Sequence, residues 1–467
     1  MGGIVRLLTR KRLFWFVVAI GLYGAYSIAV ASTGGESGEG GSVGHGGPVI
    51  AILIELVTIL LAAKLGGDLF ERFKAPAVLG ELVIGIVLGN LTLIGIDALD
   101  PIKNDITLQV LAELGVIILL FQVGLESTVS EMMKVGLASF MVAIFGVITP
   151  FFLGWGVALW FLPEASVYVH LFIGATLTAT SVGITARVLK DVGKITTREA
   201  KIILGAAVID DILGLVILAV VTGVISAVNT GSDNGLSSGM ILWIIAKAVL
   251  FIVGAVVVGQ FLLPHFFKLG GRLRGQGVLL SFSLLVCFSL ALVAGEIGLA
   301  PIVGAFAGGL ILEEVHFRDF KGSGIHQLEE LVHPIAVFLV PIFFVRMGML
   351  VDLTTFANVD ILGFAAILTL AAVVGKQACS LAIFDKRTNR IAIGLGMIPR
   401  GEVGLIFAGI GARLMIDGDP VISTGTYSAV VIMVILTTLV TPPALVASMR
   451  NTGGSRSEGG HSSESPA

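Results

Sequence analysis

Long apolar runs separated by short polar stretches occupy most of the chain downstream of Gly47. An α-helix needs about 20 consecutive apolar residues to cross the hydrocarbon core of a bilayer. Most of the runs approach or exceed that length, although several are short or interrupted by Gly and Pro. The pattern predicts an all-α polytopic membrane protein with thirteen transmembrane helices, numbered in chain order, at approximately 48–65, 77–95, 107–124, 135–160, 167–188, 200–226, 239–265, 277–295, 299–313, 335–351, 360–381, 390–413 and 423–447.

Composition agrees with a bilayer as the solvent of these helices. Of the 467 residues, 56% are hydrophobic and 13% are charged, whereas soluble domains carry roughly 25% charged residues. The formal net charge of −3 does not point to a nucleic-acid partner, and we expect none. Cys287 and Cys379 both lie inside apolar runs, so we expect them to be small buried side chains.

The two ends of the chain differ from the apolar region between them. Residues 1–31 have the basic start, the apolar stretch and the small residues near a cleavage site that are typical of a secretory signal peptide. A retained extra N-terminal helix is the alternative. Either interpretation places the Gly/Ser-rich residues 32–47 outside the cytoplasm. Residues 448–467 are rich in Gly, Ser and Glu and are expected to form a disordered tail.

Lys and Arg residues fall almost entirely in one set of alternate loops between the predicted helices. The other set holds only Lys103 and, at a helix end, Arg413. Because positively charged loops stay in the cytoplasm, the first predicted helix should start outside and the C-terminus should be cytoplasmic. The basic set comprises Arg72, Lys74, Lys134, Lys190, Lys194, Arg198, Lys201, Lys268, Arg272, Arg274, Arg318, Lys321, Lys386, Arg387 and Arg390.

Two motifs occur twice in the chain at similar spacing. The first motif opens the second and ninth predicted helices, and the other closes the third and tenth: Ala75–Gly80 and Ala300–Gly304, then Phe121–Leu125 and Phe344–Met349. The second helix runs outward and the ninth inward, so the two copies are inverted, as in alternating-access transporters. We therefore expect a membrane domain over 48–447, with repeats at 48–226 and 277–447 and a linker helix at 239–265.

Asp210 and Asp211 lie in the middle of the sixth predicted helix. A charge at that depth costs several kcal/mol, so intramembrane acids indicate a functional site. Adjacent helical residues project about 100° apart, so one acid can meet a fixed partner while the other faces a cavity. Lys376, inside the eleventh predicted helix, is the candidate partner. Snorkelling of its amine toward the cytoplasmic end is the alternative.

The fifth and twelfth predicted helices are interrupted at equivalent positions of the two repeats. The fifth contains the small, hydroxyl-rich stretch Gly174–Gly183, and the twelfth contains Gly394–Gly404 with a central proline. Unwound backbone at membrane depth is tolerated only where it lines a cavity or is buried in protein. The pattern predicts two crossing discontinuous helices whose carbonyls and half-helix ends face a site beside the acids. Hydroxyl groups that only hold helices together are the alternative.

These motifs make the chain similar to the bacterial monovalent cation/proton antiporters, which include sodium/proton antiporters with paired aspartates and Kef-type potassium efflux systems. The resemblance implies exchange of sodium or lithium for protons across the bacterial inner membrane. It also implies a homodimer in which a mobile core of helices 4–6 and 11–13 moves against a dimerisation domain. The matching pieces are Pro76–Gly89 with Glu81, Phe121–Gly124, Thr178–Gly183, Asp210-Asp211, Phe343–Gly348, Lys376 and Pro399–Glu402.

The resemblance also implies roles for individual residues. Asp211 would bind the transported cation or a proton, and Asp210 would pair with Lys376. Thr180 and Ser181 would belong to the crossing that coordinates the ion. No cofactor is expected and the chain is not expected to be an enzyme, because exchange by competition for one carboxylate needs binding rather than catalysis. Three further residues would be structural or charge partners: Glu81, Arg400 and Glu402.

Two positions depart from the family pattern, and a third residue has no role that the resemblance explains. Asp210 stands where electroneutral relatives carry Asn, which favours an electrogenic exchanger. Ala206 replaces the Glu that pairs with the helix-12 Arg in those relatives, so Arg400 is expected to find another partner, with Glu402 the nearest. Arg346 matches no family position, and a dimer or inter-domain contact is as reasonable as a role in transport.

Other functions stay open at this point. One is a potassium/proton antiporter or an organic-anion symporter of related architecture. Another is a membrane-embedded ion or pH sensor that does not transport, although the intact acids and Lys376 argue against it. The predicted loop 313–333 carries histidines and carboxylates that can sense pH near neutrality, and a solvated loop without that role is the alternative.

Overall fold

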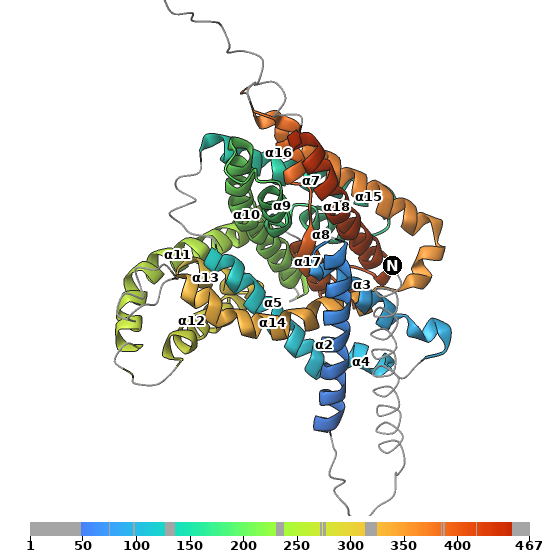
Figure 1. Cartoon of the computed structure of the whole chain (residues 1–467), viewed down its shortest axis with the longest axis horizontal. Helices are drawn as coiled ribbons and strands as arrows, with labels where there is room; N and C mark the ends of the chain where they lie inside the picture. The colour runs from blue at the N-terminus through green and yellow to red at the C-terminus, as the bar shows by residue number, and fades with distance from the viewer. Residues whose placement is uncertain are drawn as a thin grey trace, which may run out of the picture. The chain divides into compact units, whose positions relative to one another are not determined.

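The computed structural model of the chain describes residues 48–73, 75–96, 99–126, 136–229, 238–270, 273, 277–312, 325–383, 385, 388–416 and 418–450 (Figure 1). The predicted signal peptide or extra helix (1–31), the segment 32–47 and residues 451–467 of the predicted tail lie outside the described residues. Almost all of the described chain is helical.

The apolar runs of the sequence form helices because a membrane leaves backbone groups no partner except one another. In chain order the helices are α2 (Pro48–Arg72), α3 (Ala77–Gly89), η1 (Leu91–Ile94), α4 (Asp100–Asn104), α5 (Ile106–Glu126), α7 (Leu137–Phe161), α8 (Val167–Thr176), α9 (Val182–Asp191), α10 (Arg198–Asn229), α11 (Ser238–Gly270), α12 (Val278–Glu296), α13 (Pro301–Leu310), α14 (Ile325–Met349), η3 (Leu353–Ala357), α15 (Val359–Gln377), η4 (Ala378–Ala382), α16 (Arg390–Gly396), α17 (Gly401–Gly411) and α18 (Thr424–Arg450).

Each predicted transmembrane segment coincides with one described helix or with two helices separated by a short break. Nine described helices are long and apolar enough to cross a membrane, and ten if the bent pair α16–α17 forms one span. The helices α3, α8 and α13 are apolar but shorter. The helices agree with an all-α polytopic membrane protein, whereas the count of thirteen crossings and the inverted repeats stay predictions.

The departures from the expected elements include two helix boundaries and one short strand pair. α14 begins at Ile325 rather than at residue 335, so Glu329, Glu330 and His333 lie in a helix instead of a loop. α18 continues to Arg450, which makes the start of the predicted tail helical. Hydropathy finds the apolar part of a helix and misses its polar turns. A two-residue antiparallel ladder, β1 (Met415–Ile416) with β2 (Asp419–Pro420), also departs from the all-α expectation.

The chain divides into two compact units. Unit 1 contains the chain up to Gly115 together with Val337–Val351, and unit 2 contains Val116–Ala336 together with Asp352 onward. All of α7 to α13 and α15 to α18 belong to unit 2, so the division does not follow the two predicted repeats. Unit 2 also contains α11–α13, which do not belong to the mobile core that the resemblance implies.

Unit 1 shows how glycine lets membrane helices approach closely. A Cβ atom at Gly80 of α3 would lie 2.0 Å from Gly66 O of α2, so no larger residue fits there. Glu81, the next residue, is 8% exposed and interacts electrostatically with Lys64 of α2. The role of Glu81 as a charge partner stays a prediction.

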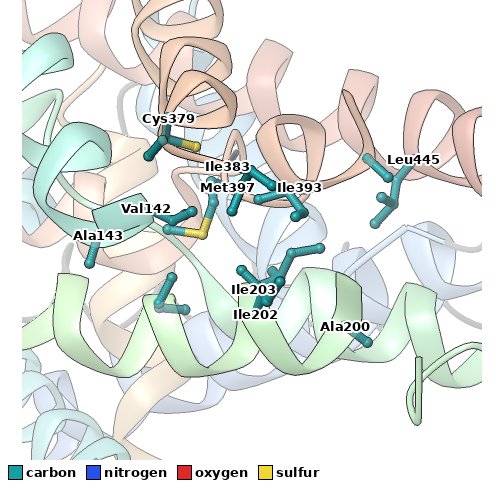
Figure 2. Close-up of a cluster of buried hydrophobic side chains, with 14 of the residues drawn as sticks. Val142, Ala143, Ala200, Ile202, Ile203, Cys379, Ile383, Ile393, Met397 and Leu445 are labelled. Atoms are coloured by element: carbon teal, nitrogen blue, oxygen red, sulfur yellow. The ribbon is translucent and has the colours of Figure 1, made fainter. Parts of the chain in front are cut away.

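Unit 2 contains a large apolar cluster contributed by several of its helices. Figure 2 shows Val142 of α7, Ile203 of α10, Cys379 of η4 and Met397 after α16 converging there. Cys379 is free and buried, as is Cys287. Because lipid tails are as apolar as these side chains, van der Waals packing rather than the hydrophobic effect stabilises the cluster.

Candidate ion-binding site

Two broken helices cross in unit 2. α8 and α9 are separated by residues 177–181, and α16 and α17 by residues 397–400; the second pair is bent by 45°. The two linkers are hydrogen-bonded, with Ser181 N donating to Pro399 O at 2.7 Å. Thr185 Oγ1 donates to Gly396 O at 2.7 Å. The sequence placed both breaks correctly, and the crossing brings together two half-helix N-termini and two C-termini.

Gly401 makes the close approach of the two linkers feasible. Its φ is +42°, a left-handed conformation that favours glycine. A Cβ atom there would also lie 2.4 Å from Ser181 Cβ. The approach lets Ser181 Oγ donate to Glu402 Oε2 at 2.9 Å. Glu402 is partly exposed, so its carboxylate is held by one hydroxyl at the rim of the crossing.

Asp210 is enclosed and paired. Lys376 Nζ donates to its Oδ1 at 2.9 Å and to its Oδ2 at 3.1 Å. Asp210 is 1% exposed and Lys376 is 0% exposed. The Thr180 hydroxyl donates to Met397 O at 3.4 Å and also lies near the Asp210 carboxylate. Lys376 therefore points inward to the acid, and its amine does not snorkel.

Asp211 has different surroundings, although it is the next residue of α10. It is partly exposed, because its side chain projects about 100° away from that of Asp210. This part of α10 passes beside the crossing: a Cβ atom at Gly214 would lie 3.8 Å from Thr178 Oγ1 and 3.9 Å from Phe407 Cζ. Asp211 interacts electrostatically with Glu402. Asp211 is therefore a partly exposed residue on the part of α10 that passes beside the helix crossing.

Arg400 differs from the expectation. Its Nη1 donates to Ala179 O at 2.9 Å and its Nη2 to Ala372 O at 3.0 Å, while Glu402 accepts from Ser181 instead. The expected Arg400–Glu402 pair is therefore wrong. Residues two apart at a helix start do not face each other. Arg400 instead donates to Ala179 O, a carbonyl of the α8–α9 linker that the break leaves without an intrahelical donor, and to Ala372 O of α15.

Two residues singled out in the sequence belong to unit 1. Glu81 belongs to unit 1, whereas Asp210 and Asp211 belong to unit 2. Arg346 of α14 is 7% exposed and its Nη2 donates to Gln109 Oε1 of α5 at 3.3 Å. The structure thus gives Arg346 a polar partner within unit 1.

Sequence reasoning missed one residue that faces the buried pair. Gly146 of α7 points toward Lys376 and Asp210. The available signal was Gly146 followed by Pro150 one turn later inside an apolar run. Within the described ranges, no group of three or more His, Cys, Asp or Glu side chains could hold a metal ion. The oxygens at the crossing, from carboxylate, hydroxyl and backbone, are the remaining candidate ligands for a monovalent cation.

Comparisons with known proteins agree with this geometry. The family model described as "Sodium/hydrogen exchanger, transmembrane" matches residues 56–449. The high-affinity Na(+)/H(+) antiporter NhaS3 of Synechocystis sp. is 40% identical over 431 residues, covering 85% of this chain and 89% of that protein. The Na(+)/H(+)-K(+) antiporter GerN of Bacillus cereus is 36% identical over 397 residues, covering 84% of this chain and 94% of that protein.

The solved structure of the sodium proton antiporter MjNhaP1 from Methanocaldococcus jannaschii has the same fold. It superposes with a TM-score of 0.66 at 16% identity and covers 87% of this chain and 99% of its own. The prediction of an all-α polytopic membrane protein is confirmed at that level, as is the resemblance to the bacterial cation/proton antiporters. The matched relatives are named as transporters rather than as enzymes. The chain therefore belongs to the sodium/hydrogen exchanger family.

Proposed function

We propose that this protein exchanges sodium for protons by alternating access, with Asp211 binding either the cation or a proton. The observation that carries the proposal is the contrast within one acidic pair. Asp210 is enclosed and paired with Lys376, whereas Asp211 is partly exposed beside the helix crossing. A carboxylate without a fixed partner is free to exchange its ligand. The names of NhaS3 and GerN support sodium and protons as the exchanged ions.

The surroundings of Asp211 suit a hard monovalent cation. Such ions prefer oxygen ligands, and the crossing offers hydroxyls and unwound backbone carbonyls. Ser181 holds the Glu402 carboxylate at the rim, which supplies a second negative charge. A cation and a proton compete for Asp211, so binding of one releases the other. That competition couples the two fluxes without a catalytic step.

The Asp210–Lys376 pair favours an electrogenic cycle. Two protons would enter for each sodium ion expelled if the pair releases one proton per turn and Asp211 the other. Net positive charge then moves inward, and each charge gains about 2.3 kcal/mol per 100 mV of inside-negative potential. A membrane potential would therefore accelerate sodium exit.

Proteoliposomes test the exchange itself. Sodium, lithium and potassium gradients are applied in turn to purified protein, and proton movement is followed with a pH-sensitive dye. We expect sodium to drive proton flux in the opposite direction. Protein that binds sodium without moving protons would be a sensor rather than an exchanger.

Voltage then separates the stoichiometries. Vesicles clamped with potassium and valinomycin are assayed at several potentials, after potassium has been shown not to be a substrate. If sodium exit coupled to proton entry becomes faster when the inside of the vesicle is made negative, the result supports two protons per cation. A rate that ignores voltage leaves one-for-one exchange.

Potassium is the second candidate cation. GerN is named as an antiporter of potassium as well as sodium, and this chain is 36% identical to it. A potassium-driven proton flux equal to or larger than the sodium-driven one would replace sodium as the proposed substrate. The lithium gradient in the same assay shows whether lithium is also exchanged for protons.

We also propose a homodimer in the bacterial inner membrane, with thirteen crossings in two inverted repeats and a cytoplasmic C-terminus. The Lys and Arg bias of the predicted loops supports the orientation. The helix breaks at equivalent positions of the two predicted repeats support the inverted arrangement. Labelling of single cysteines placed in alternate loops, from each side of the membrane, tests both. Alternation that fails at one loop would change the crossing count.

A further inference from the structure

Gly146 of α7 lies directly beside the buried ion pair. A Cβ atom at this position would lie 3.6 Å from Lys376 Nζ, 3.7 Å from Asp210 Oδ1 and 3.8 Å from Cys379 Cβ. Those are ordinary van der Waals distances, and no other heavy atom is nearer. The absence of a side chain therefore leaves about a methyl group of space next to the ammonium and the carboxylate.

Other glycines in the same contact between helices serve a different purpose. A Cβ atom at Gly375 of α15 would lie 2.9 Å from Pro150 Cα, and one at Gly154 of α7 would lie 3.0 Å from Leu177 Cδ2. Both glycines allow neighbouring segments to touch. Gly146 does not, because an alanine would fit there without displacing backbone. Close packing alone does not account for glycine at this position.

Pro150 changes the backbone one turn after Gly146. Proline has no N–H, so it cannot donate the helical hydrogen bond to the carbonyl of Gly146. That carbonyl points along α7 toward Pro150, and Pro150 contacts α15 at Gly375. The carbonyl thus lies on the side of α7 that faces the helix carrying Lys376.

Besides Asp210, the acid that acts electrostatically on Lys376 is Asp211, which binds the sodium ion in the proposed cycle. α7 carries no charged residue, and the adjoining cluster with Val142 and Cys379 is apolar (Figure 2). Arg400 adds a second positive charge that acts on Lys376. An ammonium has three N–H donors, and an ammonium leaving its carboxylate in such surroundings needs another acceptor.

We propose that Gly146, with its carbonyl left open by Pro150, is a positioning residue that receives the Lys376 ammonium when the Lys376–Asp210 pair opens during transport. The glycine supplies the space and the carbonyl supplies the acceptor. This inference rests on the proposed exchange function, since the pair must open once per cycle. The site accepts a hydrogen bond from the lysine side chain of this same chain, either directly or through one water molecule.

Gly146→Ala tests the inference in the full-length protein in proteoliposomes. The added methyl group fits the resting structure, so we expect an unchanged melting temperature in detergent and an unchanged sodium KM. It fills the receiving space, so the maximal exchange rate should fall about tenfold, as expected when a buried charged donor loses an acceptor. Gly156→Ala in the same helix is the matched control, because no heavy atom lies within 4 Å of a Cβ atom there.

Two further variants separate positioning from packing. Gly146→Ser adds a hydroxyl that accepts the ammonium, so it should recover at least half of the rate lost in Gly146→Ala. Pro150→Ala restores an N–H that occupies the Gly146 carbonyl, so it should lower the maximal rate in the same direction without raising the sodium KM.

The outcomes are distinct from those that test exchange. Wild-type protein that moves no protons refutes the exchange function, and the inference with it. A wild-type exchanger whose Gly146→Ala variant keeps the full rate overturns the inference alone. Equal losses in the Ala and Ser variants, together with lower melting temperatures, would make Gly146 a packing residue and also overturn it.

Discussion

The two neighbouring acids of α10 lie in contrasting surroundings. Around Asp210 everything is closed: Lys376 donates to both of its oxygens, Thr180 adds a hydroxyl, and its exposed fraction is 1%. Asp211, by contrast, is partly exposed, and its part of α10 passes beside the helix crossing. One residue of helix rotation separates the paired charge from the charge that we propose to exchange its ligand.

The hydroxyl pair of the broken helix repeats the contrast. The Thr180 hydroxyl lies near the enclosed Asp210, whereas Ser181 donates to the partly exposed Glu402 at 2.9 Å. Adjacent residues of one linker thus lie beside two different carboxylates. In the proposed mechanism the closed side, with Asp210, stabilises the structure, and the open side, with Asp211 and Glu402, binds the ion. Mutations on the two sides should therefore have different consequences.

The largest expected effect is on the open side. Asp211→Asn should abolish sodium-driven proton movement, because an amide neither releases a proton nor balances a bound cation. It should also abolish any rise in melting temperature on sodium addition, since only native protein that binds sodium is stabilised by it. Flux and thermal melts measure the two effects. A folded variant with appreciable exchange would remove Asp211 from the centre of the mechanism.

On the closed side stability should suffer first. Lys376→Ala leaves Asp210 as a buried carboxylate without its cation, which typically costs ~3–5 kcal/mol. Removing both charges, in Asp210→Asn with Lys376→Gln, should restore much of that stability without restoring the wild-type cycle. Thermal melts of the single and double variants in detergent measure this. Additive losses in the double variant would mean that the pair is not energetically coupled.

The sequence alone was sufficient for the coarse fold and for the positions of the helix breaks. Apolar runs between basic loops identify membrane helices, since no other structure satisfies the backbone there. Glycine, proline and hydroxyl residues identified both interruptions to within a few residues. Helix ends were less certain, because the polar first turns of α14 resemble a loop in composition. The number of crossings depends on short helices such as α13, which composition does not settle.

The contacts of the site could be predicted only in part. Two adjacent acids and one lysine at membrane depth leave few partners, so burial favoured a pair between Lys376 and one of the acids, and only the resemblance to the antiporters identified that acid as Asp210. The partner of Arg400 did not follow, because backbone carbonyls exposed by a break in another helix leave no trace in the sequence. The contact of Gly146 with the pair depends on how α7 packs against α15, which a single sequence does not specify.

Glu402 offers a smaller test of the open side. Glu402→Gln removes one negative charge near the proposed cation while the amide oxygen still accepts from Ser181. At an effective dielectric constant near 20, loss of one charge about 6 Å away costs on the order of 1–3 kcal/mol. We expect the sodium KM to rise about tenfold with an unchanged melting temperature. An unchanged KM would leave Glu402 as a structural residue of the crossing.

The smallest expected effects are those of removing the Ser181 and Thr180 hydroxyls, and they compare the surroundings of the two acids most directly. Ser181→Ala removes the donor that orients Glu402, a partly exposed contact of about 1 kcal/mol, so the sodium KM should rise about fivefold while the melting temperature stays unchanged. Thr180→Ala removes a buried hydroxyl that donates to Met397 O and lies near the enclosed Asp210, so it should lower the melting temperature and leave the KM within about twofold of wild type. Titration of transport against sodium concentration and thermal melts of the same preparations measure both. If the two variants changed the same quantity to the same extent, the open and closed sides would be one coupled site, and the separation of a structural charge from an exchangeable charge would not hold.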